Sequence, residues 1–214
     1  MTQERTIVKG DAGHSRRTDQ SRRTQAERRT QTRAALIAAG RTLFTERGFA
    51  GAGREEIVER AGLTRGALYH HFASKEDLFA AVYEEVERDL CDAVIAAAAT
   101  SSDPVDGLRL GAFAFLDAAA TPEVRRVVLL DGPAVLAPEV QHEIAQRYGL
   151  GLVREALRAA AAAGRLAVGP VDLLAPVLLA ALHEAATSIA DGADEDGMRQ
   201  VVESLLTAIT SRPA

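Results

Sequence analysis

The sequence predicts an all-α protein of about nine helices, arranged as a three-helix N-terminal domain followed by a larger helical C-terminal domain. Apolar residues return every three or four positions along most of the chain, which is the period of a helix with one buried face. Capping residues and proline or glycine pairs interrupt this pattern repeatedly. The sequence has no alternating β-branched run and no hairpin turn signal, so strands are not expected.

Three helices are predicted in the N-terminal part. The first ends at Gly48, and the second covers about residues 54–61. Thr64 is placed to cap a third helix that carries Phe72 on its inner side. Residues 61–64 join the second and third helices, and two short helices joined by such a turn form a helix-turn-helix.

The remaining helices are recognised by their first residues. Ser74 begins a Ser-Lys-Glu-Asp sequence, which resembles a capping box and starts a long fourth helix. Asp172 is placed to cap the eighth helix. Gly149 and Gly151 lie inside the seventh helix and each costs about 1 kcal/mol relative to alanine, which makes this helix a candidate for a bend. The other predicted boundaries are Asp103-Pro104 for the fifth helix, Thr121-Pro122 for the sixth with an interruption at Gly132-Pro133, Ala137-Pro138 for the seventh, and Asp191-Gly192 before the ninth.

The net charge of −5 averages two unlike parts of the chain. Residues 1–75 hold 15 basic and 8 acidic side chains, a balance of +7, whereas residues 76–214 hold 10 and 22, a balance of −12. A basic head on an acidic body is typical of a phosphate-binding module, although a solvated basic tail is the alternative. Residues 1–29 repeat Arg-Arg-Thr without an apolar stripe, which predicts a disordered basic arm that can add phosphate affinity or reach a minor groove.

The stretch from Arg54 to Leu78 carries the most specific motif. It reads Arg-Glu-Glu-Ile-Val-Glu-Arg-Ala-Gly-Leu-Thr-Arg-Gly-Ala-Leu-Tyr-His-His-Phe-Ala-Ser-Lys-Glu-Asp-Leu. This stretch closely resembles the DNA-binding domain of the tetracycline-repressor (TetR) family of bacterial transcription regulators, and the resemblance extends over about residues 30–80. It implies a DNA-binding domain over residues 30–76 and a ligand-binding and dimerisation domain over residues 77–214.

The third helix is the predicted recognition helix, because its N-terminal end can enter the major groove. Arg65 can form two hydrogen bonds with a guanine, and Gly66 lets the backbone approach the DNA closely. Lys75 is placed to bind a phosphate. The resemblance implies DNA contacts at Thr64, Arg65, Gly66, Tyr69, His70 and Lys75, with His71 structural; Ala67, Arg28, Arg29 and Arg54 complete the predicted surface.

One departure from the family pattern concerns the start of the second helix. Ala52-Gly53-Arg54 stands where the family usually has a hydroxyl residue followed by an apolar one. Losing a serine or threonine cap costs about 1 kcal/mol, although glycine loses only a few tenths. The register of this helix therefore stays open, and Arg54 is expected to turn outward to a phosphate.

A small-molecule pocket is expected among helices four to eight, with apolar walls and a few polar groups. The candidate ligand contacts are Phe113, Asp131, Tyr148 and His183, and ordinary core packing is the alternative for each. The resemblance implies a regulator, most simply a repressor, that is released by a small-molecule effector, and whether binding represses or activates stays open. In the hypothesised mechanism the effector shifts helix four and so changes the separation of the recognition helices. A constitutive DNA-binding or architectural protein without a ligand is the alternative.

The eighth and ninth helices carry wide apolar faces, and two such helices from each protomer can form a four-helix interface. Ordinary core packing accounts for part of that surface. The resemblance implies a homodimer, and a two-fold pair of recognition helices predicts a palindromic operator. The candidate interface residues are Val177, Leu178, Ala181, Leu182, Ala185, Ile189, Val201, Val202, Leu205, Leu206 and Ile209.

The chain is expected to be a cytoplasmic protein that is not an enzyme and uses no metal or cofactor. Cys91 is the only cysteine, which excludes an intramolecular disulfide and a multi-cysteine metal site. His183-Glu184 begins like a zincin motif, but Thr187 stands where the second histidine belongs. The charge-free apolar run over residues 173–182 is about half the roughly 20 residues that cross a bilayer, and no signal peptide is evident, so no membrane contact is expected.

Overall fold

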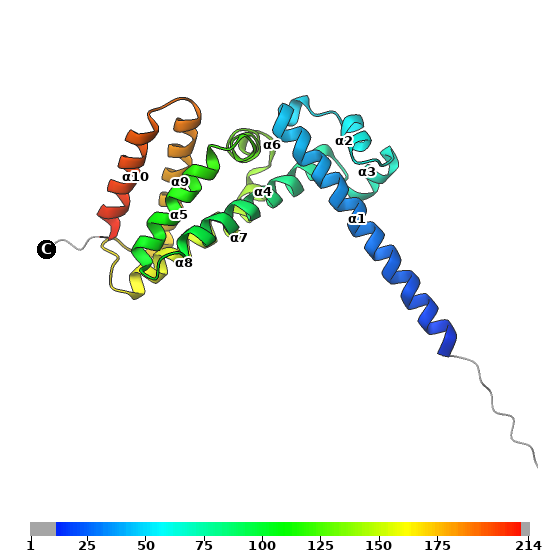
Figure 1. The fold of residues 1–214 in the computed structure, drawn as a ribbon, viewed down its shortest axis with the longest axis horizontal. Coiled ribbons are helices and arrows are strands. Elements are labelled where there is room, and N and C mark those ends of the chain that lie inside the picture. The colour runs from blue at the N-terminus through cyan, green and yellow to red at the C-terminus, as the bar shows by residue number, and fades with distance from the viewer. Residues whose placement is uncertain (1–11, 211–214) are drawn as a thin grey trace, which may run out of the picture.

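The computed structural model describes the backbone of residues 12–210 and the side chains of residues 25–210. Its elements are α1 (Ala12–Gly51), α2 (Arg54–Arg60), α3 (Arg65–His71), α4 (Lys75–Ala98), α5 (Pro104–Ala119), the π-helical η1 (Val124–Asp131), α6 (Gly132–Val135), α7 (Pro138–Arg147), α8 (Gly149–Ala162), α9 (Val171–Ala190) and α10 (Glu195–Thr210). The predicted all-α class is confirmed for this range. Figure 1 shows a head, made of α2, α3 and the end of α1, and a body of the later helices, with α4 running between them.

Helix α1 begins earlier than the sequence predicted. Residues 12–29 belong to a continuous helix, so the prediction of a disordered arm over residues 1–29 is wrong for them, while residues 1–11 lie outside the described residues. The chain has neither glycine nor proline between Gly13 and Gly40, and its arginine, glutamine and alanine residues favour helix. The start of α1 extends away from the head as an isolated rod (Figure 1).

Gly48 bends the end of α1. Its φ of 72° and ψ of 172° interrupt the helical geometry, and glycine adopts this conformation without the strain that a side chain would cause. The straight part of α1 therefore ends where the sequence predicted, although helical turns continue to Gly51. A Cβ at Gly48 would also clash with the guanidinium of Arg126 from η1. The bend consequently brings the end of α1 against the body.

Three aromatic rings join the head to the start of α4. The ring of Phe79 lies edge-on to those of Phe44 and Phe49 in α1, with centroid distances of 5.2 and 5.3 Å. Phe44 and Phe79 are fully buried, and Phe72 at the end of α3 is buried as predicted. Helix α4 therefore packs with both lobes, and the predicted domain boundary between residues 76 and 77 falls in its first turn.

Two predicted helix caps, Thr64 and Ser74, are confirmed, and Asp103 caps α5 at its predicted start. The Thr64 hydroxyl accepts a hydrogen bond from the Ala67 N–H at 3.3 Å, and the Ser74 hydroxyl accepts one from the Asp77 N–H at 3.0 Å. Asp103 accepts hydrogen bonds from two N–H groups in the first turn of α5, at 2.8 and 3.0 Å. These side chains satisfy N–H groups that a helix start otherwise leaves unpaired.

The predicted cap at Asp172 is wrong. Pro170 is the N-cap of α9, with extended backbone, so the helix begins two residues earlier and Asp172 lies in its first turn. The Asp172 carboxylate instead forms ion pairs with Arg154 at 3.0 Å and Arg158 at 3.4 Å, both in α8. Asp172 therefore ties α9 to α8.

Two predicted helices of the body are interrupted. The seventh divides into α7 and α8 at Tyr148, whose φ of −112° and ψ of −96° are not helical. Gly149 and Gly151 follow directly and weaken the helix at this point. The sixth becomes η1 and then α6, which begins at Gly132. Gly132 lies so close to Tyr83 of α4 that a Cβ would clash with the tyrosine ring.

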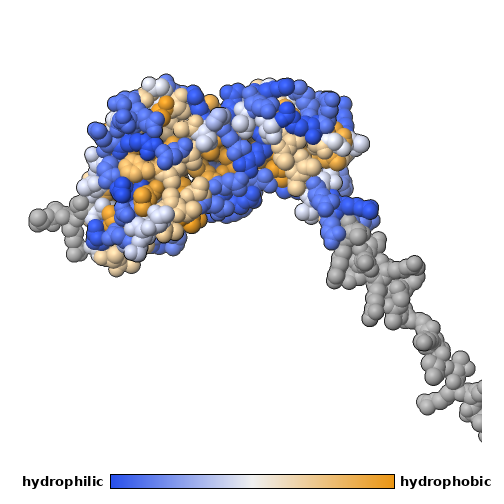
Figure 2. All heavy atoms as spheres, viewed as in Figure 1, coloured by the Kyte–Doolittle hydropathy of each residue, from blue (hydrophilic) through white to orange (hydrophobic). Residues whose placement is uncertain are grey.

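The body packs in layers around α5. Helix α5 contacts α4, α8 and α9, while α10 contacts α9 and α5 at the outside. Figure 2 shows apolar residues reaching the surface of the body between polar patches. The most exposed apolar side chains are in α9 and α10: Leu173 is 69% exposed, Val177 65% and Val201 62%.

Candidate DNA-binding surface and effector cavity

The structure brings most of the predicted DNA contacts together on the exposed face of α3. Leu68 faces inward and is 3% exposed, which fixes the opposite side of the helix outward. Arg54, at the start of α2, is exposed beside this face, whereas Arg28 and Arg29 are exposed farther away on α1. The exposed residues of α3 and its cap are Thr64, Arg65, Gly66, Tyr69 and His70, with Ala67 half-buried.

Two arginines flank the Tyr69 ring on this surface. Arg54 donates a hydrogen bond to the Tyr69 hydroxyl at 3.1 Å, and the Arg65 guanidinium lies 5.8 Å from the ring centroid. Hydrogen bonding to Arg65, and then to Arg54, lowers the pKa of Tyr69. Arg65 also pairs with Glu55 at 3.5 Å, but both side chains are exposed, so solvent screens this pair. Both arginines can therefore exchange these contacts for a phosphate or a base.

Glu56 replaces the hydroxyl cap that α2 lacks. Gly53 is the N-cap residue, with extended backbone, and Glu56 lies three residues later. The Glu56 carboxylate accepts a hydrogen bond from the Gly53 N–H at 3.3 Å and pairs with Arg47 through its other oxygen. Arg54 is the first residue of α2 and is exposed beside Tyr69, so the helix starts at the residue that the sequence predicted.

Lys75 is less available to a phosphate than predicted. Its ammonium donates a hydrogen bond to the carbonyl of Phe49 and lies 4.3 Å from the centroid of that ring. These contacts anchor the end of α1 to α4, and burial lowers the pKa of Lys75. His71 is half-buried, and burial, followed by the charges of His70 and two arginines of α1, lowers its pKa. Partial burial and a lowered pKa favour the neutral form of His71, and its structural role stays a prediction.

A narrow cavity lies in the body beside α4. The space free of atoms is about 770 Å³, part of which is open to solvent. The volume that water molecules can enter is only about 90 Å³. Five helices line it, as predicted for a pocket among these helices. Its lining residues are Tyr83, Glu87, Leu90, Cys91, Val94 and Ala98 of α4, Gly107, Leu108, Gly111, Ala112 and Phe115 of α5, Ala145 of α7, Gly149, Leu152, Val153 and Ala156 of α8, and Leu179, Leu182 and His183 of α9.

Four polar side chains interrupt the apolar wall. The Tyr83 hydroxyl donates a hydrogen bond to Glu87 Oε1 at 3.0 Å, and Glu87 is only 5% exposed. Burial raises the pKa of Glu87 despite this hydrogen bond, and burial also raises the pKa of Cys91 to about 12. The ring of His183 lies 5.3 Å from that of Phe115, and burial lowers the pKa of His183. Low polarity thus favours the neutral form of each group.

His183 is the only predicted ligand contact among the described lining residues. Phe113 lies elsewhere on α5, where the guanidinium groups of Arg109 and Arg199 are each 5.8 Å from its ring centroid. The Tyr148 hydroxyl donates a hydrogen bond to Glu84 at 3.2 Å, outside the cavity. The structure therefore corrects the predictions for Phe113 and Tyr148. Sequence reasoning missed the Tyr83 and Glu87 pair, because a glutamate in an amphipathic helix is typical of a solvated surface.

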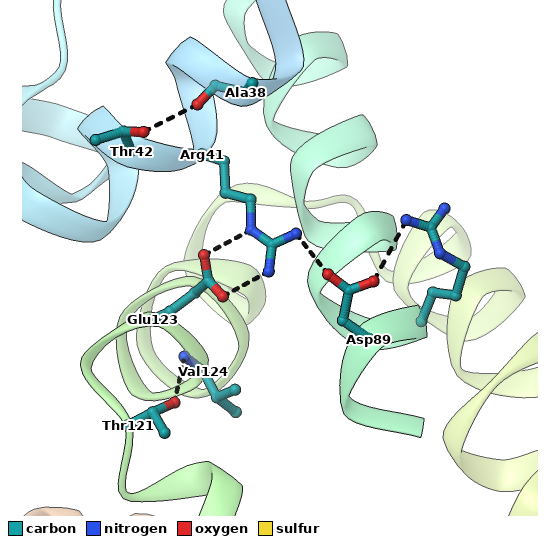
Figure 3. A network of polar contacts seen from close by, with 8 residues as sticks. Ala38, Arg41, Thr42, Asp89, Thr121, Glu123 and Val124 are labelled. Atoms are coloured by element: carbon teal, nitrogen blue, oxygen red, sulfur yellow. Dashed lines mark hydrogen bonds and ion pairs between the residues drawn. The ribbon is translucent and has the colours of Figure 1, made fainter. Parts of the chain in front are cut away.

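Arg41, in the part of α1 that belongs to the head, lies between the carboxylates of Asp89 and Glu123 (Figure 3). Arg41 of α1 forms a two-pronged pair with Glu123, which precedes η1, through Nε and Nη2 at 2.6 Å each. Its Nη1 pairs with Asp89 of α4, also at 2.6 Å. Hydrogen bonding to Glu123 is the largest cause of the raised pKa of Arg41. This network ties α1, α4 and η1 to one another.

Asp131 belongs to a second contact between η1 and the head, which corrects its prediction as a ligand contact. Its carboxylate accepts a hydrogen bond from the Phe49 N–H at 2.6 Å and pairs with Arg126 at 3.5 Å. Arg126 in turn donates to the Arg47 carbonyl at 3.5 Å. We refer to Glu123, Arg126 and Asp131 together as the η1 clamp. Because the η1 clamp contacts α1, a movement of η1 would displace the end of α1 that packs in the head.

The predicted dimer-interface residues divide between core and surface. Helix α9 has two apolar faces, and periodicity cannot distinguish the inward one. Val177, Val201 and Leu205 are exposed, Ala181 and Ile189 are half-buried, and Leu173 is an exposed apolar residue that the prediction missed. The predictions are wrong for the residues buried in the protomer's own core, which are Leu178, Leu182, Ala185, Val202, Leu206 and Ile209.

Both lobes match known protein families. Residues 36–82 match the model described as bacterial regulatory proteins, tetR family, and residues 105–211 match the tetracyclin repressor-like, C-terminal domain. The chain belongs to the tetR family of bacterial regulatory proteins. This TetR-family protein is accordingly a DNA-binding transcription regulator, with the helix-turn-helix in the first matched range.

Similar proteins carry the same assignment over most of the chain. The transcriptional activator FasR of Mycolicibacterium smegmatis is 33% identical over 67% of this chain and 63% of its own length. The transcriptional repressor AcnR of Corynebacterium diphtheriae is 27% identical over 84% of this chain and 92% of its own. A solved TetR-family regulator from Pectobacterium atrosepticum is 32% identical, with a TM-score of 0.74, over 88% of this chain and 98% of that one. All three are transcription regulators, of which one is named an activator and one a repressor.

Replacing Arg65 with alanine is expected to lose discrimination at one base pair, by about 1–3 kcal/mol, because a two-pronged arginine–guanine contact would be removed. Lys75→Ala should weaken binding to all sequences alike, because Lys75 anchors the end of α1 to α4 and does not read a base. Competition titrations against single-base operator variants measure the difference, and equal losses on every sequence for both variants would contradict the assignment of Arg65.

Replacing Gly66 with alanine should separate folding from DNA binding. A Cβ at Gly66 would meet no atom closer than Thr64 Oγ1 at 3.9 Å, so the protein's own packing does not require glycine. Alanine in a helix is favoured by up to about 1 kcal/mol, and the variant should be at least as stable as the wild type. Operator affinity should nevertheless fall. Urea unfolding and fluorescence anisotropy check the two effects, and an unchanged affinity would show that the backbone does not approach DNA here.

Proposed function

We propose that this regulator is a homodimeric repressor, which binds a palindromic operator in the bacterial cytoplasm and is released by a small-molecule effector bound in the cavity. The observation that carries this proposal is that α4 both lines the cavity and packs against the head. Tyr83 and Glu87 line the cavity on the same helix, α4, whose first turns hold Phe79 against the head. An effector that changes the position of α4 therefore acts on the recognition helix.

The η1 clamp supplies a second route for the same signal. Gly132 packs on the Tyr83 ring just after η1, and Tyr83 is hydrogen-bonded to Glu87 in the cavity. The clamp residues then contact α1 at Arg41 and Phe49. An effector that displaces Tyr83 would move η1 and α4 together, and so change the separation of two recognition helices in a dimer. Differential affinity of the effector for the two arrangements would supply the coupling free energy.

The exposed stripe of α9 and α10 supports the homodimer. Leu173, Val177 and Ala180 lie on one side of α9, and Val201 and Leu205 lie on α10. Among the described helices, α9 alone is long and apolar enough to pass a length-and-composition test for a membrane span, a test that core helices also pass. A second copy packed on this stripe would bury it in a closed two-fold interface, which explains the apolar surface without a membrane.

The cavity also favours an effector-controlled protein over a constitutive DNA-binding one. Protein interiors are normally close-packed, and an unfilled space lined by apolar groups costs stability. A purely architectural protein has no use for such a space. We propose that the protein represses transcription, because a dimer bound at the operator blocks RNA polymerase unless it also makes activating contacts with the polymerase.

Transcription from the promoter beside the regulator's own gene tests this proposal. Deletion of the gene should raise reporter expression, and a Gly66→Ala copy should fail to restore repression while a wild-type copy restores it. Reduced expression after deletion would instead assign the protein as an activator. Unchanged expression, together with no binding to the promoter fragment, would contradict its role as a regulator of that promoter.

A further inference from the structure

The cavity contains an acid but no strong base. Glu87 is the only carboxylic acid among its described lining residues, and the lining includes neither arginine nor lysine. The only basic group there is His183, whose ring lies against Phe115 and whose pKa burial lowers. An anionic effector would therefore find no positive charge in this wall, whereas a cation would find one carboxyl group.

The Glu87 carboxyl is placed to receive such a cation. Its Oε1 accepts the hydrogen bond from Tyr83, and Oε2 accepts none from another described residue. Its partner is an uncharged phenol, not an arginine or lysine, so no described side chain neutralises a carboxylate there. Charged groups are almost never fully buried without a partner. The structure thus leaves one acceptor oxygen and one potential charge unmatched within a 5% exposed side chain.

We infer that the effector is a lipophilic monocation with a slim apolar tail, such as an alkylammonium compound, and that the Glu87 carboxylate is its counterion. This inference rests on the proposed function. The narrow apolar walls hold the tail, and Glu87 holds the head group beside Tyr83 on α4. The acidic body, with a balance of −12 over residues 76–214, raises the local concentration of cations and disfavours anions.

When the cation binds, the Glu87 carboxyl group gives up its proton, so the positive charge of the cation replaces that of the proton. In the empty cavity the raised pKa of Glu87 favours the neutral acid. A quaternary ammonium ion brings a permanent charge, which favours the carboxylate, so the Glu87 proton passes to solvent as the ion pair forms. Burial disfavours the charged forms of the other titratable groups of the wall, because it raises the pKa of Tyr83 and Cys91 and lowers that of His183. Helices α5, α7 and α8 contribute no titratable lining residue within the described cavity.

Three probes with the same tail and different head groups test the charge preference. Decyltrimethylammonium, decanol and decanoate are titrated into the full-length protein by calorimetry, each below its micelle concentration. The cation should bind about 10- to 100-fold more tightly than the alcohol at pH 8, with decanoate weakest. Two buffers of different ionisation enthalpy should reveal proton release with the cation alone. Acidification to pH 6 should weaken the cation selectively.

Glu87→Gln should reduce the cation preference to less than about threefold and abolish proton release, because the amide keeps the shape but cannot ionise. Asp92→Asn is the matched control, since it removes a carboxylate from the exposed side of the same helix and should change neither result. If the Glu87 variant does not fold, the wild-type pH series still decides between the outcomes. Equal binding of the three probes, tightest binding of decanoate, or a preference that persists in Glu87→Gln would overturn the inference.

A binding assay with promoter DNA tests this inference separately from the proposed function. Anisotropy of a labelled promoter fragment is measured with and without decyltrimethylammonium. Release of the DNA by the cation supports both. Selective cation binding without any change in DNA affinity supports the effector class and contradicts release by this cavity. Release of DNA by decanoate alone supports an effector-controlled repressor and overturns the lipophilic cation.

Discussion

Val177→Glu is expected to yield a folded monomer that binds the operator about 100- to 10,000-fold more weakly than the wild type. Val177 is 65% exposed in the stripe proposed to meet a second copy, so the substitution leaves the protomer's core intact but would bury two like charges across a two-fold axis. A monomer engages one half-site, and the loss of the second, linked half-site removes an avidity of this size.

Sedimentation equilibrium and anisotropy titrations on the same preparation measure the two effects together. Val140→Glu is the control, because Val140 is an exposed valine of α7, 37% accessible and outside the stripe. It should remain dimeric with wild-type affinity. A Val177→Glu protein that stays dimeric and binds normally would place the dimer interface elsewhere.

Phe79→Ala is expected to cost about 3–5 kcal/mol of stability, which is typical for truncating a fully buried phenylalanine. The Phe79 side chain is 0% exposed and packs edge-on against both Phe44 and Phe49 of α1. The loss should be concentrated in the head, since Phe79 is the aromatic side chain of α4 that packs against α1 there. Operator binding should fall because the recognition helix is then held less firmly.

Urea unfolding gives the total loss, and amide hydrogen exchange shows where it falls. Phe113→Ala is the comparison, because Phe113 is half-buried and packs beneath two arginines at the edge of the body. Its loss should be clearly smaller and should not increase exchange in α2 and α3. Similar losses for the two variants, or faster exchange confined to the body, would show that Phe79 does not join the lobes.

Local chemistry made the head predictable from the sequence. Thr64 and Ser74 cap their helices as their positions indicated, because an N-cap bond involves residues only two or three apart. The exposed face of α3 follows from the inward position of Leu68 and Phe72 in a helix of fixed period. Even the missing hydroxyl cap has a local replacement in Glu56, which a search for glutamate three residues after Gly53 could have found.

The effector cavity was less predictable because tertiary packing determines it. Asp131 and Glu87 are both acidic residues on largely apolar faces, yet one holds the head and the other lines the cavity. Their roles depend on which helices pack against them, and periodicity does not contain that information. The same limit applies to α9, where Leu178 and Val177 are adjacent and only the fold shows that Leu178 is inside.

The long first helix illustrates a different limit. Residues 12–29 lack an apolar stripe, so no packing argument predicted a helix there. Their intrinsic propensity and the absence of glycine and proline after Gly13 are what continue α1 toward the N-terminus. Arg28 and Arg29 are thereby carried on a helix instead of a tail. Their predicted contribution to phosphate affinity is open to the same competition titrations as Lys75.

Footprinting of the purified protein on the DNA upstream of its own gene tests the central claim most directly. A dimer that reads DNA through α3 should protect two half-sites related by two-fold symmetry, with centres about 34–36 Å apart or a multiple of that spacing. Addition of decyltrimethylammonium should remove both protected half-sites together. A single asymmetric site, or protection that spreads along the DNA with increasing protein and ignores the cation, would contradict an effector-controlled dimer.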